Sequence, residues 1–279
     1  MSKRQKVQLA VSALKRLYPL ELADSSWDNT GLLVDSSGVN SSTTPLSILL
    51  TVDLTTKVAQ EAIKNKTDLI VAYHPFIFRP LKSITPSGGS QQDSLIQLIA
   101  NGISVYSPHT AVDAVQGGVN DWLCEALESN PSRSVIEPSK VTEGAGMGRV
   151  VTLSQPTDIV DLVKRIKEHL ELPYIQLATP PVFNSDLPPK VETVAICAGS
   201  GSSVFSGVKA DLYFTGEMSH HETLALVESG SYVITCNHSN TERGYLKEMK
   251  GKLEEELLKQ GLEYNVGISR EDRDPLVVV

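Results

Sequence analysis

One pattern occurs twice in this 279-residue chain, and it constrains the fold more than any other feature. In the first copy, the segment 68–74 is followed by a second apolar segment and then by a His-x3-acid motif at 109–113. In the second copy, the segment 211–217 aligns with 68–74 without a gap and is followed in the same way by a His-x3-acid motif at 238–242. Each copy has the pattern of a strand, a helix and a second strand, with polar residues where the strands end. Such a repeat predicts an internal duplication.

The repeated strands indicate the fold class. Residues 68–73 are apolar enough to be covered on both faces, which is typical of a strand in a parallel sheet. Strands and helices alternate with short connections, so we predict an α/β fold with mostly parallel sheets. We expect two similar α/β halves, 1–130 and 141–279, joined by a Pro- and Ser-containing linker at about 131–140. We expect strands at 46–52, 68–73, 103–107, 174–178, 191–197, 211–215, 232–236 and 262–268, and helices at 3–18, 55–66, 93–101, 119–128, 158–170, 219–229 and 243–260.

Composition and charge argue against several classes of protein. The net charge of −8 argues against general binding to nucleic acids or to anionic membranes, because both require a basic face. Three cysteines without CxxC spacing fit a reducing compartment, and no apolar run reaches the ~18 residues of a membrane span. We therefore expect a cytoplasmic protein. The basic, amphipathic residues 1–20 are best interpreted as a normal first helix, although they resemble a mitochondrial transit peptide. A mitochondrial or nuclear location stays open.

The residues at the predicted strand ends point to a metal. In open α/β sheets, ligand-binding groups gather beyond the carboxyl ends of the strands. Asp53 and Tyr73 are expected there, together with three imidazoles and two carboxylates: His74, His109, Asp113, His238 and Glu242. Such residues bind zinc, iron or manganese. A single strand-end histidine is usually structural, but two copies of the His-x3-acid motif favour a shared metal site where the halves meet.

Three further features are candidates for a role in the site. Glu217 replaces His74 in the second copy, so it is a candidate to orient a metal ligand or to act as a general acid or base. Gly199, Ser200, Gly201 and Ser202 follow a predicted strand and are expected to open a short helix, where their amides could hold a phosphate; a tight turn explains them equally well. His220 fits a solvated helix start better than a ligand, and its role is left open.

Taken together, several motifs resemble the family variously called GTP cyclohydrolase I type 2 homologues or NGG-interacting-factor-three-like proteins. The resemblance covers nearly the whole chain and is closest to the eukaryotic type, because many bacterial relatives have His-His where this chain has Tyr73-His74. The motifs are Trp27-Asp28-Asn29-Thr30-Gly31-Leu32, the segment 68–78, His109 to Asp113, Gly148-Arg149-Val150, Gly216 to His220, His238 to Gly244, and Asp274-Pro275.

The resemblance implies two α/β halves around a dinuclear metal site and a homo-oligomer, commonly a hexamer. By position, the implied ligands are His74, His109, Asp113, His238 and Glu242. Tyr73 is a poor substitute for a neutral imidazole, so one or two divalent transition metals per subunit are expected. The family name implies a metal-dependent hydrolase that uses activated water on a nucleotide or another small phosphorylated substrate. The alternative is a non-enzymatic metal-binding protein that engages a transcription-related or other protein partner.

Overall fold

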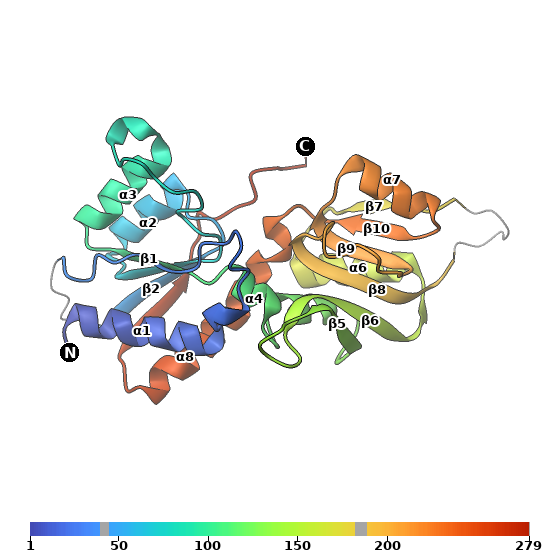
Figure 1. The fold of residues 1–279 in the computed structure, drawn as a ribbon, viewed down its shortest axis with the longest axis horizontal. Helices are drawn as coiled ribbons and strands as arrows, with labels where there is room; N and C mark the ends of the chain where they lie inside the picture. The colour runs from blue at the N-terminus through green and yellow to red at the C-terminus, as the bar shows by residue number, and fades with distance from the viewer. Residues whose placement is uncertain (40–44, 182–188, 279) are drawn as a thin grey trace. The chain divides into compact units, whose positions relative to one another are not determined.

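The computed structural model describes residues 1–39, 45–181 and 189–278 and contains two β-sheets with helices around them (Figure 1). The chain divides into two compact units, each an α/β assembly with its own sheet. Unit 1 comprises Met1–Val112 and Tyr245–Arg273, and unit 2 comprises Asp113–Gly244 and Asp274–Val279. The predicted α/β class is therefore confirmed.

Unit 1 is built on a five-stranded sheet in the order β1-β4-β3-β2-β11. Strands β4, β3, β2 and β11 pair with one another in parallel, and β1 is antiparallel to β4 at one edge of the described sheet. Helices α2 and α3 cover one face of this sheet, and α1 and α8 cover the other (Figure 1). The elements are α1 (Lys3–Leu17), β1 (Gly31–Val34), β2 (Leu46–Thr51), α2 (Thr56–Lys64), β3 (Leu69–Ala72), α3 (Ser90–Ala100), β4 (Ser104–Ser107), α8 (Leu246–Lys259) and β11 (Tyr264–Ile268).

The core of unit 1 follows from the apolar faces of these elements. Val58 and Ala62 of α2 and Leu98 of α3 are fully buried against Ile70 of β3. On the basic first helix, Val7 and Leu14 are also fully buried, so this helix is an integral part of the unit. Burying such a side chain contributes about 1.5–3 kcal/mol, which is why the amphipathic pattern alone located these helices correctly.

Unit 2 is built on a six-stranded sheet in the order β5-β6-β8-β9-β10-β7. The three strands β8, β9 and β10 are parallel, and the strands around them are antiparallel. Helix α5 packs on β6 and β8. The elements are α4 (Thr110–Ala114, where the two units meet along the chain), α5 (Val119–Cys124), β5 (Ser132–Pro138), β6 (Gly146–Thr157), α6 (Ile159–Leu170), β7 (Gln176–Ala178), β8 (Val191–Ser200), β9 (Leu212–Glu217), α7 (His220–Glu228) and β10 (Tyr232–Thr235).

The repeated sequence has the same local architecture in both units. Asp68 directly precedes β3, and its carboxylate accepts a hydrogen bond from the Ser47 amide at 3.0 Å. Asp211 directly precedes β9, and its carboxylate accepts from the Thr193 amide at 2.8 Å. Each aspartate therefore ties the start of its strand to the preceding parallel strand. In unit 1, Lys3 adds a buried ion pair to Asp68 at 3.1 Å.

The structure differs from the sequence-based expectations in several places. Residues 132–138, within the predicted linker, form β5, which pairs along most of its length with β6. The chain's last helix and strand, α8 and β11, complete unit 1, so the compact units do not follow the boundary between residues 1–130 and 141–279. Residues 202–207 form turns where a short helix was expected. The segment 132–138 was expected to be a linker because the sequence of an exposed edge strand resembles that of a loop.

In the part of the chain that the structure describes, four short 3-10 helices link other elements, at Leu20–Leu22, Pro86–Gly88, Ser239–Thr241 and Arg243–Tyr245. Across the described ranges, none of the helices has both the length and the apolar character that crossing a membrane requires.

Candidate metal centre

Three histidines of the candidate site share one structural feature, a carboxylate on the Nδ1 atom. The Nδ1···O distances are 2.9 Å for His74 and Asp53, 2.6 Å for His109 and Asp28, and 2.9 Å for His238 and Glu217. An ionised carboxylate only accepts hydrogen bonds, so Nδ1 of each ring carries the proton and Nε2 keeps its lone pair. Metal-binding histidines are commonly held in this way, because the carboxylate fixes the tautomer and makes the ring a better ligand.

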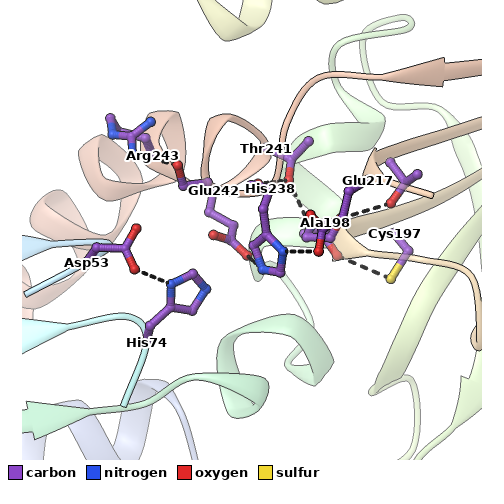
Figure 2. A network of polar contacts seen from close by, with 12 residues as sticks. Asp53, His74, Cys197, Ala198, Glu217, His238, Thr241, Glu242 and Arg243 are labelled. Atoms are coloured by element: carbon purple, nitrogen blue, oxygen red, sulfur yellow. Dashed lines mark hydrogen bonds and ion pairs between the residues drawn. The ribbon is translucent and has the colours of Figure 1, made fainter. Parts of the chain in front are cut away.

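His74 directly follows the buried strand β3, and Asp53 lies just beyond the adjacent strand β2. The parallel pairing of these strands brings the two side chains to the same edge of the sheet, where Figure 2 shows the bond between them. The Ser107 hydroxyl at the end of β4 donates to the main-chain oxygen of His74 at 3.3 Å. Three neighbouring strand ends thus position His74.

His109 lies just after β4, with a positive φ of 38° that L-residues adopt only rarely. Asp28 holds it: one carboxylate oxygen bonds Nδ1, and the other accepts from the Thr110 hydroxyl. Burial alone would raise the pKa of Asp28, but the hydrogen bonds that its carboxylate accepts from His109, Thr110 and the Asn29 amide help to lower that pKa overall. In the sequence, Asp28 stands out only as part of the motif at 27–32. Its position beside a tryptophan in a turn carries no signal of a distant histidine.

His238 follows β10 and lies between two acids. Its Nδ1 contacts Glu217, and its Nε2 is 3.4 Å from Oε1 of Glu242, which is four residues later (Figure 2). Tetrahedral ligands at about 2.0–2.2 Å from a metal are separated from each other by roughly 3.4 Å. The Nε2 and Oε1 atoms are therefore spaced as two ligands of one ion. Glu242 is 2% exposed, and a carboxylate buried this deeply requires a compensating partner.

Gly199 keeps space beside these two atoms. A Cβ atom at this position would lie 2.7 Å from Nε2 of His238 and 2.9 Å from Oε1 of Glu242. Gly199 also has a φ of 62°, which favours glycine. Its amide donates to the Thr241 hydroxyl at 2.9 Å, and that hydroxyl donates to the main-chain oxygen of His238 at 2.7 Å. The end of β8 is thus fixed against the His238 loop but leaves space beside Nε2 of His238 and Oε1 of Glu242, and these residues fit a metal ion.

The remaining predicted residues have varied surroundings. Tyr73 is buried, with its ring edge-on to those of His74 and His109. Asp113 is buried on α4. His220 is exposed at the start of α7, with its ring 5.2 Å from that of His221.

The Gly-Ser segment 199–202 offers fewer free hydrogen-bond donors for a phosphate than its sequence predicts. Gly199 and Ser200 end β8, and turns follow them, so no helix amino terminus points at a phosphate here. The Gly199 amide is bonded to Thr241, and the Ser202 hydroxyl donates to Glu222 at 2.8 Å. Phosphate binding by Gly199, Ser200, Gly201 and Ser202 stays a prediction.

An exposed aromatic pair lies beside His109. Trp27 is 52% exposed and Phe78 is 47% exposed, and their ring centroids are 6.0 Å apart. The indole also lies edge-on to the His109 ring, at 5.7 Å. The indole N–H donates to Asp24 at 2.8 Å, which fixes the ring while much of its surface remains exposed.

Comparisons with known proteins agree along the full chain. The family model described as Duf34/NIF3 (NGG1p interacting factor 3) matches residues 5–275. "Protein NIF3 homolog" from Schizosaccharomyces pombe is 48% identical, with 100% of each chain covered. "NGG1-interacting factor 3" from Saccharomyces cerevisiae is 44% identical over 99% of this chain and 98% of its own length. Human "NIF3-like protein 1" is 35% identical over 96% of this chain and 91% of its own.

A solved structure supports the fold. The crystal structure of a Bacillus cereus protein related to NIF3 has a TM-score of 0.81, with 19% identity, 100% of this chain covered and 99% of that chain.

Proposed function

Because the chain belongs to the Duf34/NIF3 family and presents three carboxylate-held imidazoles, we propose that it is a metal-dependent hydrolase. The proposed ligands are His74, His109, Asp113, His238 and Glu242. The observation that carries the proposal is the shared Nδ1–carboxylate bond, which places the proton on Nδ1 and the lone pair on Nε2 of every candidate histidine. Structural histidines have no common reason to share one tautomer.

Each residue has a distinct part in the proposed chemistry. A bound divalent ion, with zinc, iron and manganese as the candidates, supplies water activation and neutralises charge on the reacting group. Glu217 orients His238 through Nδ1, and its 58% exposed side chain is also a candidate general acid or base. Asp28 and Asp53 orient the other two imidazoles. The buried Tyr73 packs against two of them.

We propose a nucleotide or another small phosphorylated molecule as the substrate. Trp27 supports this class, because an exposed ring beside a candidate ligand can stack on a planar base. The Gly-Ser segment at 199–202 is the candidate phosphate contact.

Metal content per subunit tests the proposal directly. Protein purified without chelators should contain one or two divalent ions, and His238→Ala and His109→Ala should each lose metal. His221→Ala is the matched control, because it removes an exposed imidazole on α7. Metal-loaded protein is then assayed with GTP and phosphoesters. A chain that folds normally but binds no divalent ion contradicts the proposal.

A second candidate function is a protein-binding role. It is supported by the name of the yeast relative, which describes an interacting factor. A metal-bearing protein that hydrolyses no nucleotide or phosphoester but retains a defined protein partner after His238→Ala would favour this role. We further propose a cytoplasmic homo-oligomer, a hexamer or its dimer subassembly, which sedimentation of the purified protein and imaging of a tagged chain will test.

A further inference from the structure

In the described part of unit 1, the sheet ends at β11, whose outward backbone groups pair with no further strand. Strand β11 closes one side of the described sheet and pairs only with β2 there. The main-chain oxygen of Glu263 accepts from Leu46, and the amide of Ser269 donates to Leu50. In a parallel pair, every second residue directs its N–H and C=O groups to the neighbouring strand. Residues 263, 265, 267 and 269 therefore face β2, and the residues between them face away. Tyr264, Val266 and Ile268 therefore present their N–H and C=O groups at the open edge.

A basic groove runs along this edge. Its volume is about 990 Å³, and its walls come from α2, β11, the segment after β11, and α8. Four cationic side chains line it, namely Lys57, Lys64, Lys250 and Arg270. This concentration of positive charge stands out in a chain whose net charge is −8.

The acids in the groove leave this positive charge in excess. Glu61 and Glu271 also line it. The Glu61 carboxylate accepts from the Ser269 hydroxyl at 2.5 Å and from the Arg270 amide at 3.1 Å, so it braces the end of β11. Lys57, Lys64 and Arg270 are exposed.

We propose that this groove binds an extended peptide with acidic side chains, which adds to the sheet as a strand beside β11. Backbone bonding to an open strand edge supplies affinity, and side-chain complementarity supplies specificity. The alternating outward groups of Tyr264, Val266 and Ile268 match the backbone of such a peptide, and the lysines match its carboxylates. Gly267 leaves room for it, because a Cβ there would meet only Leu49, at 3.9 Å. This surface is independent of the proposed metal centre.

The test uses the full chain and a fluorescent peptide of alternating glutamate and valine, with binding followed by anisotropy. The charge variant is Lys57→Glu with Lys64→Glu, and its control is Lys164→Glu with Lys209→Glu, two exposed lysines of unit 2. We expect the first pair to weaken binding roughly tenfold or more and the second to change it little.

The strand-addition step has its own pair of variants. Ile268→Pro removes an outward N–H group, which edge strands tolerate, and Ile268→Ala removes the same side chain while keeping that group. Binding should fall further in the proline variant. Equal binding by both variants, or equal binding of a lysine–valine peptide, overturns the proposal. Oligomers of the wild-type chain that dissociate in the Lys57/Lys64 variant would assign the edge to a second copy instead and also overturn it.

Discussion

The substitution Gly199→Ala tests the candidate metal centre most sharply. The new Cβ would lie 2.7 Å from Nε2 of His238 and 2.9 Å from Oε1 of Glu242, closer than such atoms pack. At least one ligand atom must move. The loss of orienting partners lowers metal affinity by about 10–100-fold in known sites, and we expect at least that loss here. The left-handed φ of 62° adds a cost of about 1–2 kcal/mol to folding.

Gly207→Ala is the matched control for this backbone cost. Gly207 has a φ of 76°, but a Cβ there would meet nothing within 4 Å. Both variants should therefore lose similar stability in urea unfolding followed by circular dichroism, measured on metal-free protein. Only Gly199→Ala should lose metal affinity in a competition titration with a chromogenic chelator. If Gly199→Ala binds metal as tightly as Gly207→Ala does, the ion does not lie between His238 and Glu242.

Three further results are expected. Glu217→Ala should weaken metal binding roughly 10–100-fold, measured in the same titration, because His238 loses its Nδ1 partner. Asp121→Asn should lower the free energy of unfolding by about 3–5 kcal/mol, because the carboxylate pairs with the buried Arg149 at 2.7 Å. Desolvation would raise the pKa of Asp121, but Arg149 lowers that pKa overall. The stabilisation is therefore present above the ordinary carboxyl pKa and is lost as the pH falls through the folded-state pKa of Asp121. Urea unfolding at several pH values measures it, and a variant whose stability loss does not shrink in acid contradicts the assignment. Trp27→Ala should raise KM for a nucleotide substrate by the equivalent of about 1–3 kcal/mol while metal content is unchanged; an unaltered KM argues against stacking.

The features predicted well from sequence are those set by local pattern. Apolar periodicity located most helices and the parallel strands, and the repeat identified Asp68 and Asp211 as equivalent, which their matching bonds to the preceding strands confirm. Strand β6 was missed. It contains Arg149, which is only 2% exposed, and a buried arginine looks like a surface residue until its partner is known.

The partners of the histidines were harder to predict than the histidines themselves. Repetition singled out His109 and His238, whereas the role of Asp28 depends on a fold that joins positions 81 residues apart. The turn at 202–207 was mistaken for a helix because its Gly-Ser composition suits either structure. In each case, the deciding contact comes from a segment distant in sequence, which no local pattern reports.

The interleaved units have a consequence for synthesis. The chain leaves unit 1 after Val112, returns at Tyr245, and leaves again after Arg273. On the ribosome, α1 and β2 emerge early but must wait for α8 and β11 to complete their packing, whereas 113–244 can close as one continuous stretch. Until β11 has been synthesised, Leu46 and Ile48 of β2, which are buried in the folded protein, lie on an incomplete sheet. Residues 245–273 complete a unit that begins more than a hundred residues before unit 2 does, so a chain that stops before them would lack part of the core of unit 1.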